Sequence, residues 1–281
     1  MIMTLRILTD TASDIPDSTA EELGIGLIEL NIHFGDEMLK DRRDIDTRQF
    51  FERLATDSVH PATSQPSPGE FAEAYQSLID DGADEILFVS IHGSLSGTLD
   101  SAKQAIELVS GARIDTVDTH RVSFAQGVAA VRAAEIAKNG GTLDEAKAVA
   151  EEVAERSNSL VIADTLEYLK KGGRLNQSQY LLGSMMRVKP ILGVGAEPPY
   201  VTIATRVRTL KKALATMVDM ATQQKIEWAA IVHGEGLENA QAVQELLQPH
   251  LPDVPIYDVT PVLGVHLGPG TVGLHWLPAK D

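Results

Sequence analysis

The sequence predicts an α/β protein with two domains, the first built around a parallel, doubly wound sheet. Three observations support this prediction. Apolar, β-branched runs alternate with segments of helical spacing over the first half of the chain, a pattern typical of parallel sheets covered by helices. The second half has a different pattern, with two strand-like runs on either side of a Glu-Pro-Pro turn at residues 197–199. The length of 281 residues is enough for two hydrophobic cores.

The predicted elements of the first half follow one another from residue 5 to residue 138. The clearest strand is Glu85–Ile91, an apolar, β-branched run typical of a buried central strand. Ligands of doubly wound sheets bind at the carboxyl ends of the strands, so the loops at Asp10 and Ser94 are predicted to lie near a ligand. The predicted strands cover residues 5–9, 26–34, 85–91 and 113–117, the predicted helices cover residues 14–24, 47–56, 69–80, a segment soon after 91, and 124–138, and residues 60–68 form a proline-rich loop.

The second half is predicted to begin near Asn158, which divides the chain into domains of residues 1–158 and 159–281. A helix ends near Ser157, and a short helix later on is stopped by Gly172 and Gly173. The two runs beside the Glu-Pro-Pro turn are predicted to form an antiparallel hairpin. The predicted strands cover residues 160–163, 189–194, 200–205 and 228–232, the predicted helices cover residues 165–171 and 237–247, and a glycine-rich end follows.

Composition excludes several classes of function. The chain has 24 basic and 40 acidic residues, a formal charge of −16, which disfavours nucleic acid and anionic membranes as partners. It has no cysteine, which excludes disulfides, thiolate nucleophiles and cysteine-bound zinc. The histidines show no metal-ligand spacing, so no metal site is expected. No signal peptide and no run of roughly 20 apolar residues is recognisable, so we expect a cytoplasmic protein.

The loop after the central strand has the composition of an anion site. Ser94, Ser96 and Thr98 surround Gly97 where a new helix is predicted to begin, and a helix N-terminus offers unpaired N–H groups to a carboxylate or phosphate. The same serines could simply be helix caps. A nucleophile elbow is not present, because the centre of Gly-Ser-Leu-Ser-Gly is Leu95 where that motif requires serine.

Four further positions are candidates for ligand contact, each with a structural alternative. Thr63 lies in a loop stiffened by prolines, which could also be an ordinary turn. Arg174 follows two glycines and could bind an anion bidentately or lie on the surface after a helix end. Arg206 could bind phosphate or face solvent. His266 stands among three glycines and a proline, a context that predicts an irregular segment suited either to ligand contact or to a structural role.

The chain contains, in this order, the motifs Thr9–Pro16, Thr63–Ser67, Ser94–Thr98, Asp164–Arg174, Lys189–Leu192 and His266–Gly270. Taken together, these motifs resemble those of the DegV family of bacterial fatty-acid-binding proteins. The resemblance runs essentially from end to end. It implies a parallel-sheet α/β domain followed by a second α/β domain with a largely antiparallel sheet, and a long-chain fatty acid in a tunnel between or beside them.

The resemblance also implies roles for individual residues. The fatty-acid carboxylate would be bound by Thr63, by Ser94 with Ser96 and Gly97 nearby, and by His266. Arg174 would support transfer of a phosphate onto that carboxylate, with Arg206 as a weaker candidate. The last motif departs from the threonine-rich form common in the family, since Val265 and Leu267 flank the histidine. An apolar tunnel could be lined by Leu181, Leu182, Met185, Met186, Ile191 and Leu192.

The leading hypothesis is a non-catalytic fatty-acid carrier without a cofactor. It would present the carboxylate to a separate ATP-dependent kinase subunit, which forms an acyl phosphate for phospholipid synthesis. The chain lacks a phosphate-binding loop and a glycine-rich dinucleotide motif of its own. Two alternatives remain, a serine hydrolase or acyl transferase that uses Ser94 or Ser96 with His266 as base, and a lipid carrier without a kinase partner.

Overall fold

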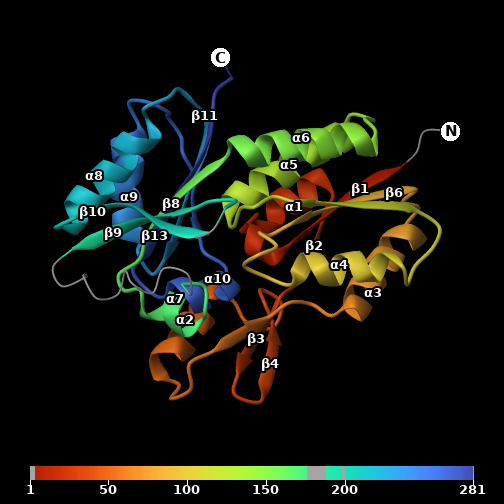
Figure 1. The fold of residues 1–281 in the computed structure, drawn as a ribbon, viewed down its shortest axis with the longest axis horizontal. Coiled ribbons are helices and arrows are strands. Elements are labelled where there is room, and N and C mark those ends of the chain that lie inside the picture. Colours follow the sequence, from red (N-terminus) through yellow and green to blue (C-terminus); the bar gives the residue numbers. More distant parts are fainter. Residues whose placement is uncertain (1–3, 176–187, 198–199, 281) are drawn as a thin grey trace.

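The computed structural model of the protein describes residues 4–175, 188–197 and 200–280. Two sheets lie side by side, each covered by helices, and a third, small sheet lies below the junction between them (Figure 1). The fold class predicted from the sequence is confirmed, with a parallel sheet in the first half and a mixed, largely antiparallel sheet in the second. Among the described residues, no helix is long and apolar enough to cross a membrane.

The first sheet contains four parallel strands in the order β2-β1-β6-β7. Alternate residues of its central strands pack on opposite layers, Leu87 and Val89 against α5 and α6, and Ile86 and Phe88 against α3 and α4. Burial on both faces explains the continuous apolar run of β6. The elements are β1 (Leu5–Asp10), α1 (Asp17–Leu23), β2 (Ile25–Ile28), α3 (Pro68–Asp80), β6 (Glu85–Ser90), α4 (Thr98–Ile106), β7 (Arg113–Asp118), α5 (Phe124–Lys138) and α6 (Leu143–Arg156).

The second sheet contains six strands in the order β10-β9-β8-β13-β11-β12, antiparallel except for the pair of β11 with β12. Helices α8 and α9 cover one face, where Ile162 and Ile231 are buried. The opposite face carries Val161 and Val232 and is directed toward the first half of the chain. The elements are β8 (Asn158–Ile162), α7 (Glu167–Lys171), β9 (Lys189–Val194), β10 (Val201–Val207), α8 (Leu210–Ala221), β11 (Ile226–Gly234), α9 (Leu237–Leu247), β12 (Ile256–Asp258), α10 (Pro261–Leu267) and β13 (Thr271–Pro278).

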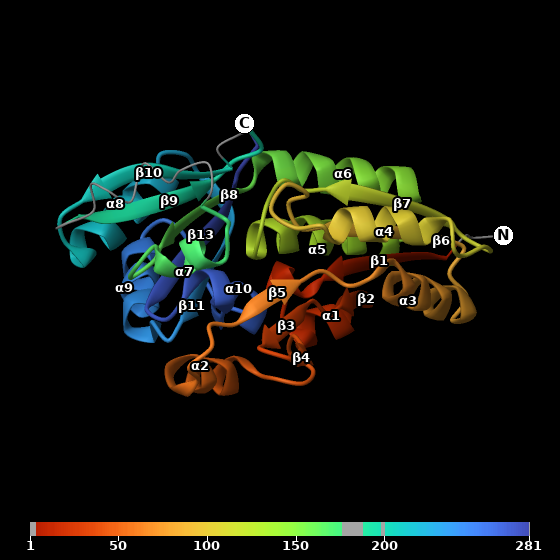
Figure 2. The ribbon, with the colours of Figure 1, turned by 60° about the horizontal axis from the view of Figure 1, so that its bottom comes forward.

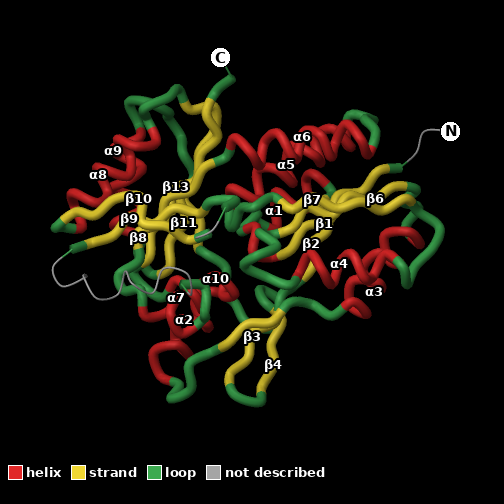
Figure 3. The backbone as a smooth tube through the Cα atoms, in the orientation of Figure 1, coloured by secondary structure: helices red, strands yellow, loops and turns green. Residues whose placement is uncertain are grey.

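A third sheet corrects one prediction. The sequence predicts a single strand over residues 26–34, but the chain leaves the parallel sheet after Ile28 and enters a separate antiparallel sheet at Asn31. Between them the backbone of Leu30 is held by the Thr11 hydroxyl and by the N–H of Asp41, so it joins neither sheet. This sheet, of order β4-β3-β5, and the helix beside it lie under the junction of the two larger sheets (Figures 2 and 3). Its elements are β3 (Asn31–Phe34), β4 (Glu37–Lys40), α2 (Thr47–Thr56) and β5 (Ala62–Ser64).

Candidate functional site

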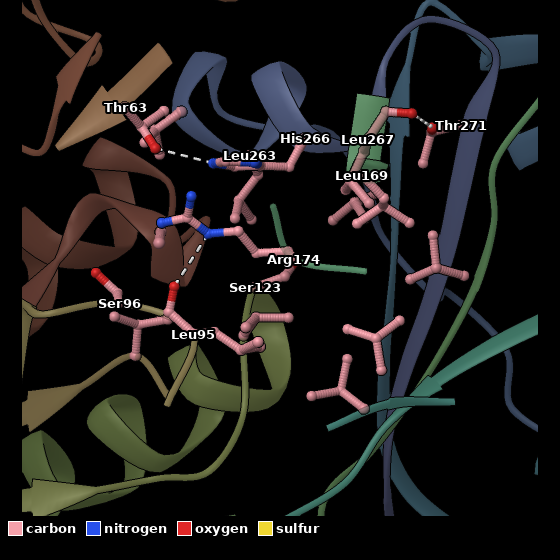
Figure 4. A pocket seen from close by; sticks show the side chains of 18 of the residues that line it. Thr63, Leu95, Ser96, Ser123, Leu169, Arg174, Leu263, His266, Leu267 and Thr271 are labelled. Atoms are coloured by element: carbon pink, nitrogen blue, oxygen red, sulfur yellow. Dashed lines mark hydrogen bonds between the residues drawn. The ribbon is translucent and has the colours of Figure 1, made fainter. Parts of the chain in front are cut away.

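A pocket of about 900 Å³, which includes open solvent at its mouth, lies where the three sheets meet. Its walls are mainly aliphatic and come from both halves of the chain, with Ile91 and Val122 from the first half and Val161, Leu192 and Val232 from the second sheet. Polar atoms of Thr63, Ser96 and Arg174 gather on one side of the pocket, and the other side carries mainly aliphatic side chains together with Thr271 (Figure 4). The polar side chains at the mouth are partly exposed, whereas most of the aliphatic wall, including Ile91, Val161 and Val232, is buried.

Thr63 and His266 form a hydrogen-bonded pair at this mouth. Thr63 lies on β5 and His266 in the last turn of α10, and their Oγ1 and Nε2 atoms are 2.9 Å apart. Burial of the imidazole, with contributions from the charges of Arg174 and His60, lowers the pKa of His266 to about 3. The imidazole is therefore neutral at physiological pH and can either donate or accept one hydrogen bond at Nε2.

The irregular segment predicted around His266 is a helix instead. Pro261 occupies its first turn, where a proline is favoured. Gly268 ends it with a φ of 73°, a conformation that favours glycine. Gly264 lies inside the helix because a Cβ there would lie 2.7 Å from the ring of Phe50. The two glycines that suggest a loop in the sequence therefore have other roles. Gly268 ends helix α10, and Gly264 allows this helix to pack closely against Phe50.

Arg174 supplies a cation to the same mouth. Its Nε donates to the carbonyl of Leu95 at 3.2 Å and its Nη1 to the carbonyl of Gly172 at 2.6 Å. Partial burial lowers the pKa of Arg174, and no carboxylate among the described residues pairs with it. A half-buried guanidinium without an anionic partner favours binding of an anion from outside the chain.

Gly172 allows Arg174 and His266 to come together. A Cβ on Gly172 would lie 2.1 Å from His266 Nδ1, so the imidazole packs directly on the glycine backbone. The carbonyl of this glycine accepts the hydrogen bond from Arg174. The Gly-Gly-Arg motif therefore positions both the cation and the histidine.

The serine loop contributes Leu95 and one hydroxyl side chain to the pocket. Ser96 lines it, with its Oγ 2.8 Å from Thr98 Oγ1. Ser94 is exposed and Gly97 packs against Gln65, so neither is among the lining residues. The structure thus brings Thr63, Ser96, Arg174 and His266 together around the mouth.

Other predicted positions lie elsewhere. Arg206 is exposed on β10 and does not line the pocket. Leu192 lines the pocket, whereas Ile191 is buried in the core on the other face of the sheet. The remaining predicted tunnel residues, Leu181, Leu182, Met185 and Met186, lie outside the described residues.

Two buried residues of the site are given no role by the sequence, although one of them lies within the motif Thr9–Pro16. The first, Ser123, lines the pocket with φ 57° and ψ −147°, a conformation that is costly for any residue but glycine. Its hydroxyl donates to a carboxylate oxygen of Asp14, whose other oxygen accepts the N–H of Thr260 at 2.8 Å. The second, Asp14, therefore links the pocket wall to the N-cap of the helix that carries His266.

One group of side chains has the composition of a cation site. His92, Asp118 and His120 place ligand atoms within 4.8 Å of one another. Hydrogen bonds already engage two of them, since Asp118 accepts the N–H of Gly93 and His92 Nδ1 accepts the N–H of Ser94. These bonds fix the loop that carries Ser96, and the expectation of no metal stays a prediction.

Fold and pocket define a class of α/β proteins that hold an apolar pocket between a parallel and a mixed sheet, with a cation and a hydrogen-bonded Thr–His pair at its mouth. The chain belongs to the DegV family. The family model, described as "Uncharacterised protein, DegV family", matches residues 4–279.

Relatives and solved structures agree with this assignment over the whole chain. DegV domain-containing proteins of Deinococcus radiodurans and Listeria monocytogenes are 34% and 31% identical to it, each over 97% of this chain and 98% of the relative. A DegV family protein of Thermus thermophilus, described as fatty acid binding, superposes with a TM-score of 0.90 at 30% identity, over 99% of this chain and 100% of its own. The DegV protein of Bacillus subtilis, described as a fatty acid binding protein, superposes with a TM-score of 0.88 at 28% identity, with the same coverage.

Proposed function

We propose that this protein binds a long-chain fatty acid, with the acyl chain in the apolar pocket and the carboxylate at Thr63, Arg174 and His266. The observation that carries the proposal is the half-buried guanidinium of Arg174, which has no described carboxylate partner and stands beside a neutral Thr–His pair at the mouth of an aliphatic pocket. A carboxylate leaving water needs such partners. The fatty-acid-binding relatives from Thermus thermophilus and Bacillus subtilis support the same ligand class.

The acyl chain supplies most of the affinity in this proposal. Burial contributes roughly 0.8 kcal/mol per methylene, so about fifteen methylenes give up to ~12 kcal/mol. Lost freedom of the ligand and of the side chains offsets a large part of this gain. We therefore expect tight binding that still allows exchange.

The proposal extends to presentation of the carboxylate to a separate ATP-dependent kinase. Thr63, Arg174 and His266 are partly exposed, so a carboxylate bound among them would be accessible to a second protein. Arg174 would also stabilise charge on a transferred phosphate, as arginine does through its planar fork of donors. In the serine loop, Ser96 is the stronger candidate for carboxylate contact because it lines the pocket and Ser94 does not.

The hydrogen bonds of the described residues do not favour the hydrolase alternative. His266 Nε2 is bonded to Thr63, and Ser96 Oγ is bonded to Thr98. Ser96 therefore lacks the histidine base that nucleophilic catalysis requires. The bond that Ser94 makes to a histidine, His92, comes from its backbone N–H and not from its hydroxyl.

Native mass spectrometry of the protein purified from a bacterial host tests the proposed function. We expect the mass of one long-chain fatty acid in addition to the chain, and uptake of one added fatty acid after delipidation. A clean protein mass with no uptake would exclude the carrier function. Adding a candidate kinase and ATP then tests presentation, since acyl phosphate should form only when both proteins are present.

Replacing Gly172 by alanine is expected to lower fatty-acid affinity by about tenfold or more, because the new methyl group overlaps His266 Nδ1 and displaces the ring. With φ at −73°, the backbone at Gly172 accepts alanine. Titration of the delipidated variant with oleic acid measures the change. Gly69→Ala is the matched control, since its Cβ would meet no atom closer than 3.8 Å.

The double variant Gly172→Ala/His266→Ala tests whether Gly172→Ala lowers fatty-acid affinity by displacing His266. If displacement of His266 is the reason, adding the Gly172 change to His266→Ala should cost little further affinity. Additive losses would show that Gly172 acts through another contact.

A further inference from the structure

One polar side chain lies among the apolar residues of the pocket, away from its mouth. His275 on β13 is fully buried and lines the pocket. Its Nδ1 is 2.9 Å from Ser159 Oγ on the neighbouring strand. Its Nε2 has no hydrogen-bond partner among the residues that the structure describes. Because a buried polar atom without a partner is costly, a ligand group that bonds this nitrogen would stabilise the occupied pocket.

The ring of His275 leans over the pocket face of β13. Thr271, Gly273 and His275 alternate onto the same face of the strand, and Thr271 lines the pocket as His275 does. A Cβ at Gly273 would lie 3.1 Å from His275 Nε2. The free edge of the imidazole therefore lies above Gly273, on the face of the strand that Thr271 and His275 present to the pocket.

His275 lies far from the place where a carboxylate would bind. Thr271 marks the mouth end of β13, because its hydroxyl donates to the carbonyl of Leu267, the residue after His266. His275 is four residues further along the strand, about 13 Å at the rise of an extended chain. If the carboxylate of an acyl chain binds at the mouth, the half of the chain distant from the carboxylate (its outer half) would therefore lie beside His275.

The chemistry of the imidazole selects a hydroxyl group. Burial lowers the pKa of His275 to about 3, so the ring is neutral, with one nitrogen as donor and the other as acceptor. The Ser159 hydroxyl can complement either tautomer at Nδ1, which leaves Nε2 as either acceptor or donor. A ligand hydroxyl can pair with Nε2 whether this nitrogen accepts or donates a hydrogen bond, and a methylene can do neither. A second carboxylate would have no cation to pair with at this position.

We propose that the pocket is adapted to an acyl chain with a hydroxyl group in its outer half, bonded to His275 Nε2, and that Ser159 orients the imidazole for this contact. This inference rests on the proposed function, since it takes the carboxylate of the same ligand to lie at the mouth.

Competition binding with stearic acid and its positional hydroxystearic acid isomers, on the delipidated full-length protein, tests this inference. We expect isomers with the hydroxyl in the outer half of the chain to bind about tenfold more tightly than stearic acid, the value of one buried hydrogen bond. His275→Leu should lose this preference and bind stearic acid more tightly than the wild type does, because the unpartnered nitrogen is gone. His275→Gln, which keeps a donor and an acceptor, should retain part of the preference, and Ser159→Ala should weaken it.

Three other binding results would contradict the inference, and one of them would also contradict the proposed function. If stearic acid binds the wild type as tightly as every hydroxylated isomer does, the inference is wrong and the fatty-acid function stands. A preference that persists unchanged in His275→Leu also overturns it. If neither stearic acid nor any isomer binds, the proposed function fails and the inference with it.

Discussion

Replacing Arg174 by methionine should lower the affinity for a long-chain fatty acid by about a hundredfold, or about 2.7 kcal/mol. Arg174 is the one lysine or arginine among the described residues that line the pocket. Truncating one member of a hydrogen-bonded charge pair costs about 2–5 kcal/mol, and partial exposure of this guanidinium places the loss near the lower end. Isothermal titration of delipidated protein with oleic acid measures it.

Two matched variants separate charge from packing in this experiment. Arg174→Lys keeps the positive charge but loses the planar fork of donors, so we expect it to recover only part of the affinity. Arg206→Met makes the same chemical change at an exposed arginine outside the pocket and should bind like the wild type.

The melting temperature of the ligand-free Arg174→Met protein distinguishes a site defect from unfolding. Removing a half-buried charge relieves a desolvation cost, while the carbonyls of Leu95 and Gly172 lose their donor. These effects oppose each other, so a shift of only a few degrees is expected. An affinity within about threefold of the wild type would rule out Arg174 as the carboxylate's cation.

The elements that the sequence predicts well are those buried on both faces. β6 forms a continuous apolar run because α3 and α4 cover one of its faces and α5 and α6 the other. The short strands of the third sheet lack such a run, and all the residues of β4 are exposed or only partly buried. The break at Leu30 depends on the hydroxyl of Thr11, 19 residues earlier. Local patterning cannot show a contact of this kind.

The candidate site is predictable in part, and mainly through the family resemblance. Thr63 and His266 are 203 residues apart in the chain, and no local pattern pairs them. The resemblance names both residues, but it does not show that His266 is helical. Ser123 and His275 have ordinary sequence neighbours, and only the fold reveals the strained backbone of the first and the unpartnered nitrogen of the second.

The largest expected effect on stability is at Asp14, which supports the helix carrying His266. Asp14→Ala leaves the N–H of Thr260 and the hydroxyl of Ser123 without their acceptor. Buried groups that lose a partner cost about 1–3 kcal/mol each, so we expect the free energy of unfolding, measured in urea, to fall by about 2–6 kcal/mol. Asp14→Asn keeps an acceptor oxygen, and asparagine tolerates the left-handed φ of 54° at this position, so its loss should be much smaller.

The stability change caused by Asp14→Asn is expected to depend on pH, because the carboxyl group of Asp14 titrates and the amide that replaces it does not. Burial raises the pKa of Asp14 to about 6 from the ordinary value of 3.8. A carboxyl group whose pKa is higher in the folded state destabilises that state increasingly as pH rises from the ordinary pKa to the raised one, and by a constant amount above it. The amide side chain of the variant is not titratable and avoids this penalty.

The comparison at two pH values therefore reports the Asp14 charge, both directly and through buried Asp41, whose pKa that charge helps to raise. Between about pH 5 and about pH 8 only the single unit up to the folded pKa contributes, so Asp14→Asn should be more favourable relative to the wild type at the higher pH by about 1.4 kcal/mol. Buried His266 and His275, whose pKa values are lowered, shift stability in both proteins alike and cancel in the difference. Asp100→Asn makes the same chemical change on the exposed face of α4 and is the matched control. If Asp14→Asn changes the free energy of unfolding by the same amount at the two pH values, burial does not raise the pKa of Asp14. The contribution of Asp14 to the stability of α10 would then come from its hydrogen bonds alone.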